Sequence, residues 1–118
     1  MKGLVRVIEC GGKGPRMVYV EDGKVTSSLD FFWPEGADLV WLDLKIKGSL
    51  QPNTKAVIFS VAGTVYDNCR IGTCPNVPML NELDVQAFNS KIPIFVCNDM
   101  EAATTGMATL FPELPFFL

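Results

Sequence analysis

The chain has 118 residues, which is the size of one ordinary domain. Apolar residues make up 48% of it and charged residues 19%, a composition that excludes intrinsic disorder. The net charge of -3, without any run of Lys or Arg, excludes the basic footprint typical of proteins that bind nucleic acid or anionic membranes.

Three short strands joined by tight turns are predicted first. Apolar and β-branched residues dominate over 4–8, 16–20 and 25–32. The first turn, residues 10–14, is rich in glycine. The second contains Asp22-Gly23, which suits a two-residue hairpin. This segment therefore predicts an antiparallel meander.

Residues 37–50 fit two different structures. The spacing of Leu39, Val40, Leu42 and Leu44 allows a helix, but residues 42–47 alternate between apolar and polar like a strand. We favour a short helix, because the chain needs a crossover before its next strand. Residues 56–62 then form a nearly continuous apolar run, typical of a parallel strand buried on both faces, which ends at Gly63.

The second half of the chain is predicted to hold a hairpin, two helices and another buried strand. The hairpin covers residues 65–74 around the turn Asp67-Asn68. Pro78 opens a helix over residues 79–88, whose apolar face is Leu80, Leu83 and Ala87. Residues 92–96 form the strand. A last helix begins at Asn98-Asp99, and its apolar face is Met100, Ala103, Met107 and Leu110.

This order predicts an α/β fold with a mixed five-stranded sheet and helices on its faces. Three antiparallel strands come first, and right-handed crossovers then place the fourth and fifth long strands parallel to the first. The loops that follow the first, fourth and fifth strands therefore leave from the same carboxyl edge, where open α/β sheets bind ligands.

Those three exits carry complementary chemistry. Glu9 and the turn Gly11-Gly12-Lys13-Gly14 follow the first strand, and successive backbone N–H groups in such a turn can bind an anion, helped by the charge of Lys13. Gly63 follows the fourth strand. Asn98-Asp99 follow the fifth, where a carboxylate can take a proton from a substrate hydroxyl. A phosphate loop with a carboxylate base is typical of phosphoryl transfer to an alcohol.

Each of these residues also has a simpler interpretation. The glycines suit a hairpin turn or a strand end, Asn98-Asp99 suit helix caps, and Glu9 and Lys13 suit solvated charges. The sequence leaves both interpretations open.

The chain has four cysteines and no histidine, so acid–base chemistry must fall to a carboxylate. None of the cysteines has CxxC spacing, and we expect reduced thiols that act as small apolar residues and no metal site; the four are Cys10, Cys69, Cys74 and Cys97. A Cys69–Cys74 disulfide and a zinc site that uses all four thiols are alternatives.

The sequence shows neither a signal peptide nor a run near the ~20 apolar residues of a membrane span, so we expect a cytoplasmic protein.

Four segments form an ordered set of motifs: residues 8–16 (Ile-Glu-Cys-Gly-Gly-Lys-Gly-Pro-Arg), 60–65, 70–80 and 94–103 (which include Cys-Asn-Asp-Met-Glu-Ala-Ala). They resemble, in order, the first phosphate motif, the Gly-Pro-Val turn, the Gly-Arg-Val and Pro-Asn-Leu-Pro segments and the Asn-Asp segment of one group of sugar kinases. That group is the bacterial glucokinases and the related ROK (repressor, open reading frame, kinase) family of the actin/hexokinase superfamily. The most specific element is Asn98-Asp99.

The resemblance implies a ribonuclease H-like (actin-like ATPase) lobe of an ATP-dependent hexose kinase that acts on a glucose-like sugar. It implies that Asp99 is the general base, which takes the proton of the sugar hydroxyl as that hydroxyl attacks the γ-phosphate. The sugar-binding residues that it implies are Asn98, Asn76 and Gly63. Those implied to bind ATP and hydrated Mg²⁺ are Glu9, Gly11, Gly12 and Lys13.

The sequence departs from the family pattern at the phosphate motif and in length. Glu9 replaces the usual Asp, which lengthens the side chain by one methylene, and Lys13-Gly14 replaces Thr-Lys or Thr-Asn. The family's second lobe supplies the other phosphate loop and the adenosine pocket. We therefore expect residues 1–118 to be one amino-terminal lobe, with 115–118 leading into a missing carboxyl-terminal lobe, and we expect this chain alone to be inactive.

Two alternatives to a kinase lobe stay open. One is a non-enzymatic sugar-sensing module, since ROK-type proteins include repressors, and the other is a degenerate kinase-like lobe. The expected partners are the sugar and the second lobe, with neither nucleic acid nor membrane. Apolar surface that the second lobe would cover gives a route to self-association through Phe111, Phe116 and Phe117.

Overall fold

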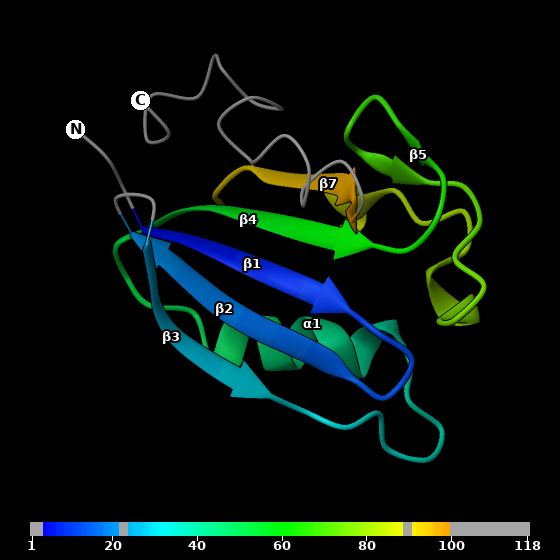
Figure 1. Cartoon of the computed structure of the whole chain (residues 1–118), viewed down its shortest axis with the longest axis horizontal. Helices are drawn as coiled ribbons and strands as arrows, with labels where there is room; N and C mark the ends of the chain where they lie inside the picture. The colour runs from blue at the N-terminus through cyan, green and yellow to red at the C-terminus, as the bar shows by residue number, and fades with distance from the viewer. Residues whose placement is uncertain (1–3, 22–23, 89–90, 100–118) are drawn as a thin grey trace.

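One mixed sheet organises the chain (Figure 1). The computed structural model describes residues 4–21, 24–88 and 91–99. The strands of this sheet lie in the order β3-β2-β1-β4-β7, with bounds β1 Leu4–Cys10, β2 Pro15–Glu21, β3 Lys24–Asp30, β4 Thr54–Val61 and β7 Ile94–Asn98. The remaining elements are α1 Leu39–Gly48, the small pair β5 Val65–Tyr66 and β6 Arg70–Ile71, and the 3-10 helices η1 Pro78–Leu80 and η2 Val85–Phe88.

The pairing directions confirm the predicted topology. Strand β1 pairs antiparallel with β2, and β2 pairs antiparallel with β3. Strand β4 is parallel to β1, and β7 is parallel to β4. The antiparallel meander and the two parallel strands that follow it are therefore both present.

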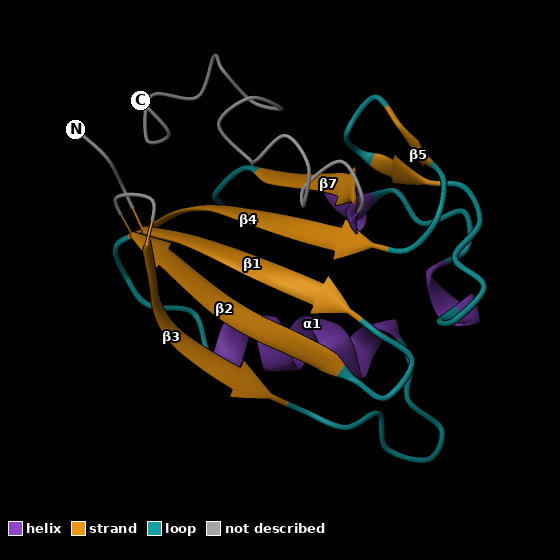
Figure 2. Cartoon of the chain, viewed as in Figure 1, coloured by secondary structure: helices purple, strands orange, loops and turns teal. Residues whose placement is uncertain are grey.

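Both faces of the central strands are buried, because successive side chains of a strand point to opposite faces. The larger core lies on the face that α1 covers (Figure 2) and includes Ile8, Met17 and Phe59. The smaller core consists of Val5, Val7, Val18, Ala56, Ile58 and Cys97. This double burial explains why β4 reads as a continuous apolar run rather than as an alternation.

Residues 37–50 contain a helix, as favoured. Asp38 is the N-cap of α1, and its side chain accepts a hydrogen bond from the backbone N–H of Trp41 (2.9 Å). Leu42 and Ile46 are buried four residues apart on the side that faces the sheet. Leu44, which would be buried in the alternative strand pattern, is 64% exposed.

The hairpin around Asp67-Asn68 is confirmed, and both residues have a φ of 54°, as a tight turn of this kind requires. The single helix predicted over 79–88 is wrong. In its place η1 and η2 are separated by residues 81–84, and Glu82 has a φ of 62°. Ala87 is exposed, and Val85 and Phe88 are buried instead.

The hairpin is the physical reason for this break. The Asn81 side chain accepts from the N–H of Cys74 (2.7 Å), and the N–H of Glu82 donates to the carbonyl of Gly72 (2.9 Å). A continuous helix would need the N–H of Glu82 for its own i→i−4 bond. The hydrogen bonds to the hairpin therefore determine the backbone conformation of residues 81–84, although the spacing of the apolar residues suits a helix.

Asn98 is the last residue of β7 rather than a helical residue, and Asp99 follows it directly. The rest of the predicted last helix and residues 115–118 lie outside the described residues. So do Phe111, Phe116 and Phe117. Among the described residues, no helix has the length and apolar character to cross a membrane.

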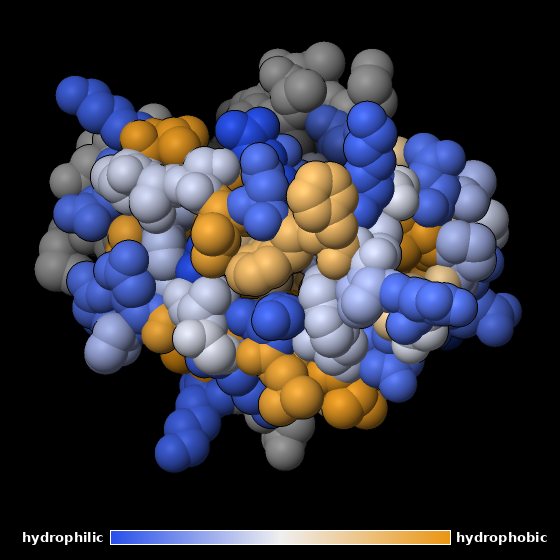
Figure 3. All heavy atoms as spheres, turned by 90° about the horizontal axis from the view of Figure 1, so that it is seen from below, coloured by the Kyte–Doolittle hydropathy of each residue, from blue (hydrophilic) through white to orange (hydrophobic). Residues whose placement is uncertain are grey.

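Large apolar side chains reach the surface among charged ones, as the view from below shows for one face (Figure 3). Every residue of the edge strand β3 is exposed. The large exposed apolar side chains of the described residues are Val25, Leu29, Phe32, Val40, Leu44 and Tyr66.

A buried arginine and a buried tyrosine join the sheet to the connection between α1 and β4. The Arg6 guanidinium lies 3.8 Å from the centre of the Tyr19 ring and donates to the carbonyl of Ser49. Burial lowers the pKa of Arg6, and Tyr19 acts in the opposite direction. The Tyr19 hydroxyl donates to the same carbonyl (3.2 Å) and accepts from the N–H of Gln51. This pair thus fixes the chain between helix and strand.

We expect Tyr19→Phe to lower the free energy of unfolding by about 1–2 kcal/mol, because the N–H of Gln51 loses its acceptor in a partly buried place. Tyr66→Phe is the matched control, since Tyr66 is 51% exposed and its hydroxyl makes no hydrogen bond to any residue that the structure describes. Urea unfolding of both variants measures the difference. Equal stability of the two variants would contradict the role assigned to Tyr19.

Candidate functional site

The carboxyl ends of three neighbouring strands stand side by side. In the parallel ladders Cys10 of β1 is opposite Val61 of β4, and Val61 is opposite Asn98 of β7. The chain therefore leaves all three strands at one level of the sheet. This register brings together the glycine turn, the Gly63 segment and Asn98-Asp99, as the topology predicts.

Segment 31–33 holds the glycine turn after β1. The indole N–H of Trp33 donates to the carbonyl of Gly11 (2.8 Å), and its backbone N–H donates to that of Lys13 (3.0 Å). At Gly14 a Cβ atom would lie 1.8 Å from the carbonyl oxygen of Phe31, so only glycine fits there. Sequence reasoning missed Trp33, because no local pattern links it to a turn twenty residues earlier.

Asn76 lies against this turn. A Cβ atom on Gly12 would be 3.7 Å from the carbonyl oxygen of Asn76 and 3.8 Å from its Cβ. Gly11, Gly12 and Lys13 are exposed, as is Asn76. Asn76, which is expected to bind the sugar, therefore lies next to the turn that is expected to bind phosphate.

Gly63 joins the exit of β4 to that of β7 and to the β5–β6 hairpin. The Asn98 side-chain N–H donates to the carbonyl of Gly63 (2.6 Å). The backbone of Thr73 passes so close that a Cβ atom on Gly63 would be 2.1 Å from its carbonyl oxygen. Thr64 and Thr73 exchange two hydrogen bonds of 3.0 and 2.8 Å. Gly63 is therefore required by close backbone approach, and Asn98 helps to hold two strand exits together.

Cys10, Cys74 and Asp99 affect one another electrostatically. Burial raises the pKa of the Cys10 thiol, and the neighbouring Cys74 raises it further. Burial also raises the pKa of Cys74, the backbone at Val77 opposes this, and the charge of Asp99 adds to the increase. Cys74 is thus an electrostatic neighbour of both Cys10, next to the glycine turn, and Asp99.

All four cysteines are free thiols, so the Cys69–Cys74 disulfide considered as an alternative does not form. The raised pKa values keep Cys10 and Cys74 protonated near neutral pH, which makes them packing residues rather than nucleophiles. Within residues 4–21, 24–88 and 91–99, no three His, Cys, Asp or Glu side chains come together to hold a metal ion.

Glu9 and Lys13 are both exposed at this edge. Glu9 is opposite Arg16 on β2 and Ser60 on β4, on the sheet face of Val7 rather than that of Cys10. Neither Glu9 nor Lys13 forms an ion pair with a residue of the described part of the chain. This edge of the sheet therefore carries two exposed carboxylates, those of Glu9 and Asp99. It also carries the ammonium group of Lys13 and the exposed backbone of the glycine turn.

A polar hollow of about 530 Å³ adjoins this edge. Its lining residues are Tyr66, Arg70, Ile71, Gly72, Thr73 and Glu82. Thr73 belongs both to this lining and to the segment that covers Gly63. Hydroxyl, guanidinium and carboxylate groups of this kind suit a polar, hydroxyl-rich ligand.

Two solved structures have a similar fold. One is a ROK family protein from Streptococcus pneumoniae TIGR4 in complex with sucrose, at 21% identity and a TM-score of 0.74, covering 94% of this chain and 39% of that one. The other is a glucokinase from Parabacteroides distasonis ATCC 8503, at 21% identity and a TM-score of 0.65, covering 95% of this chain and 36% of that one. This chain thus spans less than half the length of either. No protein-family model and no curated protein matches the sequence.

At this level of identity the likeness shows the fold. The chain has the fold of part of that ROK family protein and of part of that glucokinase, built on a mixed five-stranded sheet. The fold expected from the resemblance is therefore confirmed. The roles of individual residues remain predictions.

We expect Trp33→Phe to loosen the glycine turn, because it removes the hydrogen bond to the carbonyl of Gly11. The amide protons of Phe31 and residue 33, which donate to Pro15 and Lys13, should exchange about fivefold faster, the equivalent of about 1 kcal/mol. Trp41→Phe is the control, since Trp41 packs in the same aromatic cluster but does not bond to the turn. Hydrogen exchange by NMR measures both, and equal acceleration would contradict a specific role for Trp33.

Proposed function

We propose that this chain is the sugar-binding lobe of an ATP-dependent hexose kinase, with Asp99 as the general base. The observation that carries the proposal is the common level of the β1, β4 and β7 ends in the parallel ladders. A base and a phosphate loop must reach one small substrate at the same time, and the common level of these strand ends supports that arrangement.

Asp99 is exposed at the end of β7 and can accept the proton of a sugar hydroxyl. Loss of that proton strengthens the hydroxyl oxygen as the nucleophile that attacks the γ-phosphorus, and ADP is the leaving group. Asn98 and Asn76 bind other hydroxyls of the sugar, and Gly63 supports the site through its carbonyl, which holds the Asn98 side chain. Asn98 also keeps Asp99 in register through its bond to Gly63.

The glycine turn fits a phosphate group. A Cβ atom on Gly11 would meet nothing nearer than the carbonyl oxygen of Gly14 at 3.8 Å, so the backbone here lies open to a ligand. Gly11, Gly12 and the ammonium group of Lys13 would bind the phosphates, and the exposed carboxylate of Glu9 would orient hydrated Mg²⁺. ATP supplies the phosphoryl group when it is bound.

A second candidate is a lobe that binds sugar without catalysis, either as a sensor or as a degenerate kinase. The longer side chain of Glu9 and the Lys13-Gly14 pair favour it, because a displacement of about 1 Å at a reacting centre can cost on the order of a hundredfold in rate. The same sugar-binding residues serve both candidates. Only the phosphate half of the site distinguishes them.

We expect residues 1–118 alone to show no turnover in a coupled assay with ATP, Mg²⁺ and glucose, because they span less than half the length of the two similar structures and a kinase of this kind must close over its substrates to exclude water. Calorimetry with glucose separates the candidates once a carboxyl-terminal lobe is supplied. A kinase should bind glucose more tightly when ATP is present, and a sensor should not respond to the nucleotide. Clear turnover by the isolated chain would refute the expectation.

In the chain joined to a carboxyl-terminal lobe of this fold, Asp99→Ala should lower kcat by at least ~100-fold and change KM little, because a general base acts in the transition state. Asp30→Ala is the matched control. That carboxylate is exposed on β3, at the other edge of the sheet. Steady-state kinetics measure both variants, and an unchanged kcat for Asp99→Ala would remove Asp99 from the mechanism.

A further inference from the structure

The polar hollow beside the carboxyl edge has the size of a sugar unit. The β5–β6 hairpin, the two residues that follow it and Glu82 form its lining. Its volume of about 530 Å³ is more than three times the ~150 Å³ that holds a benzene ring, so a six-membered sugar ring with its hydroxyl groups has room in it. The backbone N–H of Glu82 donates to the carbonyl of Gly72 (2.9 Å), which fixes one wall against the other.

Four polar side chains of this lining have no hydrogen-bond or ion-pair partner among the described residues. Arg70 and Glu82 carry opposite charges and line the same hollow, but they do not form a salt bridge with each other. The hollow therefore offers a ligand both hydrogen-bond donors and hydrogen-bond acceptors. The four unpartnered side chains are Tyr66, Arg70, Thr73 and Glu82.

Gly72 places the Tyr66 hydroxyl in this hollow. A Cβ atom on Gly72 would lie 2.7 Å from Cε2 of Tyr66 and 3.3 Å from its hydroxyl oxygen, so the ring packs over this glycine. The same Cβ atom would collide with Oγ1 of Thr64. The Arg70 guanidinium lies 5.6 Å from the centre of the Tyr66 ring, and this contact limits the positions of both side chains.

The hollow meets the proposed sugar site at Gly63. Thr73 lines the hollow, and its carbonyl oxygen lies directly against Gly63. The carbonyl of Gly63 in turn accepts a hydrogen bond from the Asn98 side chain (2.6 Å). The N–H of Thr64, the residue after Gly63, donates to the same Thr73 carbonyl (3.0 Å). Two residues in direct contact, Thr73 and Gly63, therefore link the hollow to Asn98.

We propose that the hollow binds a second sugar unit, so that the substrate of this lobe is a disaccharide rather than free glucose. The inference rests on the proposed function and names the substrate class of that site. The unit that is phosphorylated lies at the proposed sugar site, and the hollow binds the other unit. A sugar hydroxyl can donate to Glu82 and accept from Arg70, and the hydroxyls of Tyr66 and Thr73 can bond to others.

The opposite charges of the lining favour a neutral ligand over an ion. An anion in the hollow would be repelled by Glu82, and a cation would be repelled by Arg70. A small zwitterion is the competing occupant, since its carboxylate could bind Arg70 and its ammonium group could bind Glu82. Such a ligand would leave the hydroxyls of Tyr66 and Thr73 without a partner, whereas a sugar unit has hydroxyl groups for all four side chains.

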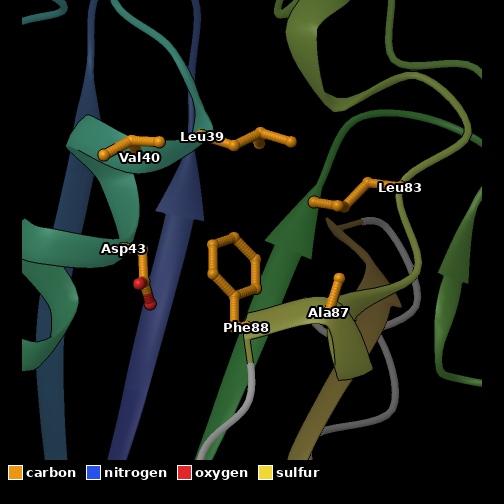
Figure 4. Close-up of a pocket in the computed structure, with 6 residues that line it drawn as sticks. All are labelled: Leu39, Val40, Asp43, Leu83, Ala87 and Phe88. Carbon is orange, nitrogen blue, oxygen red and sulfur yellow. The ribbon is translucent and has the colours of Figure 1, made fainter.

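The pocket between α1 and η2 has the opposite chemistry and serves as an internal control (Figure 4). Sugar hydroxyls placed there would lose their hydrogen bonds to water and gain few in return. The methyl signals of Leu39 and Leu83 should therefore not respond to any sugar. Apart from Asp43, the lining of that pocket is apolar, namely Leu39, Val40, Leu83, Ala87 and Phe88.

The test is an NMR titration of the whole chain with maltose and cellobiose, whose linkages are of opposite anomeric form, and with the matching methyl glucosides. At least one disaccharide should bind about fivefold more tightly than its methyl glucoside, the equivalent of one additional hydrogen bond. That disaccharide should shift the amide signals of Gly72 and Thr73 and the side-chain Nε–H signal of Arg70. The methyl glucosides should shift the amide signals of Gly63 and Asn76 and leave those of the hollow in place.

Two variants of the hollow should remove the advantage of the disaccharide. Arg70→Met should lower the affinity for the disaccharide to that for its methyl glucoside, and it should leave the methyl glucoside within about twofold. Glu82→Gln removes the charged acceptor of the opposite wall and should weaken the disaccharide in the same way. Arg16→Met is the matched control, because that guanidinium is exposed on β2 outside the hollow, and it should change neither ligand.

Equal affinity for the disaccharides and their methyl glucosides would overturn the inference and leave the proposed sugar site intact. Disaccharide binding that is unchanged in both Arg70→Met and Glu82→Gln would also overturn it. A parallel titration with glycine tests the zwitterion, and shifts in the hollow with glycine but with neither disaccharide would assign the hollow to that class. If no sugar shifts any signal of the folded chain, the proposed function fails together with the inference.

Discussion

The parallel ladder β1–β4–β7 is the constraint on which the rest of the structure depends. Its register puts Cys10, Val61 and Asn98 at one level, so three loops that are far apart in sequence begin beside one another. Burial of both faces of these strands makes that register hard to change, because a slip by one residue would move each side chain from one core to the other, where its shape no longer fits. The geometry of the edge is therefore a consequence of core packing.

Side-chain contacts then tie the loops to the ladder and to each other. Trp33 hydrogen-bonds to the glycine turn, and Asn98 hydrogen-bonds to the segment that follows β4. Asn81 hydrogen-bonds to Cys74, which lies two residues before Asn76. The two partners of these hydrogen bonds are seven residues apart in the shortest case and thirty-five in the longest. The proposed base, amides and phosphate turn are thus positioned by a few polar contacts on a rigid sheet, as a preorganised site requires.

The sequence was informative wherever a local pattern had one solution. The apolar run over 56–62 and the turn at Asp67-Asn68 predicted a buried strand and a hairpin, and topology alone predicted which exits share an edge. The segment 79–88 failed, because apolar residues three and four apart suit one helix or two 3-10 turns equally well. The bonds that decide between them come from Gly72 and Cys74, and no helical spacing reveals them. Trp33 was missed for the same reason.

Two glycines mark where main chains cross with no room between them. At Gly14 and Gly63 any side chain would run into the carbonyl oxygen of Phe31 or Thr73. Even the methyl group of alanine is too large at either crossing, so no other residue can replace these glycines without moving the backbone. In a library of random variants selected for folding, glycine should therefore persist at positions 14 and 63, whereas Gly11 and Gly48 have space for a side chain. If glycine at one of these open positions is needed for ligand binding, that need comes from the ligand and not from the fold.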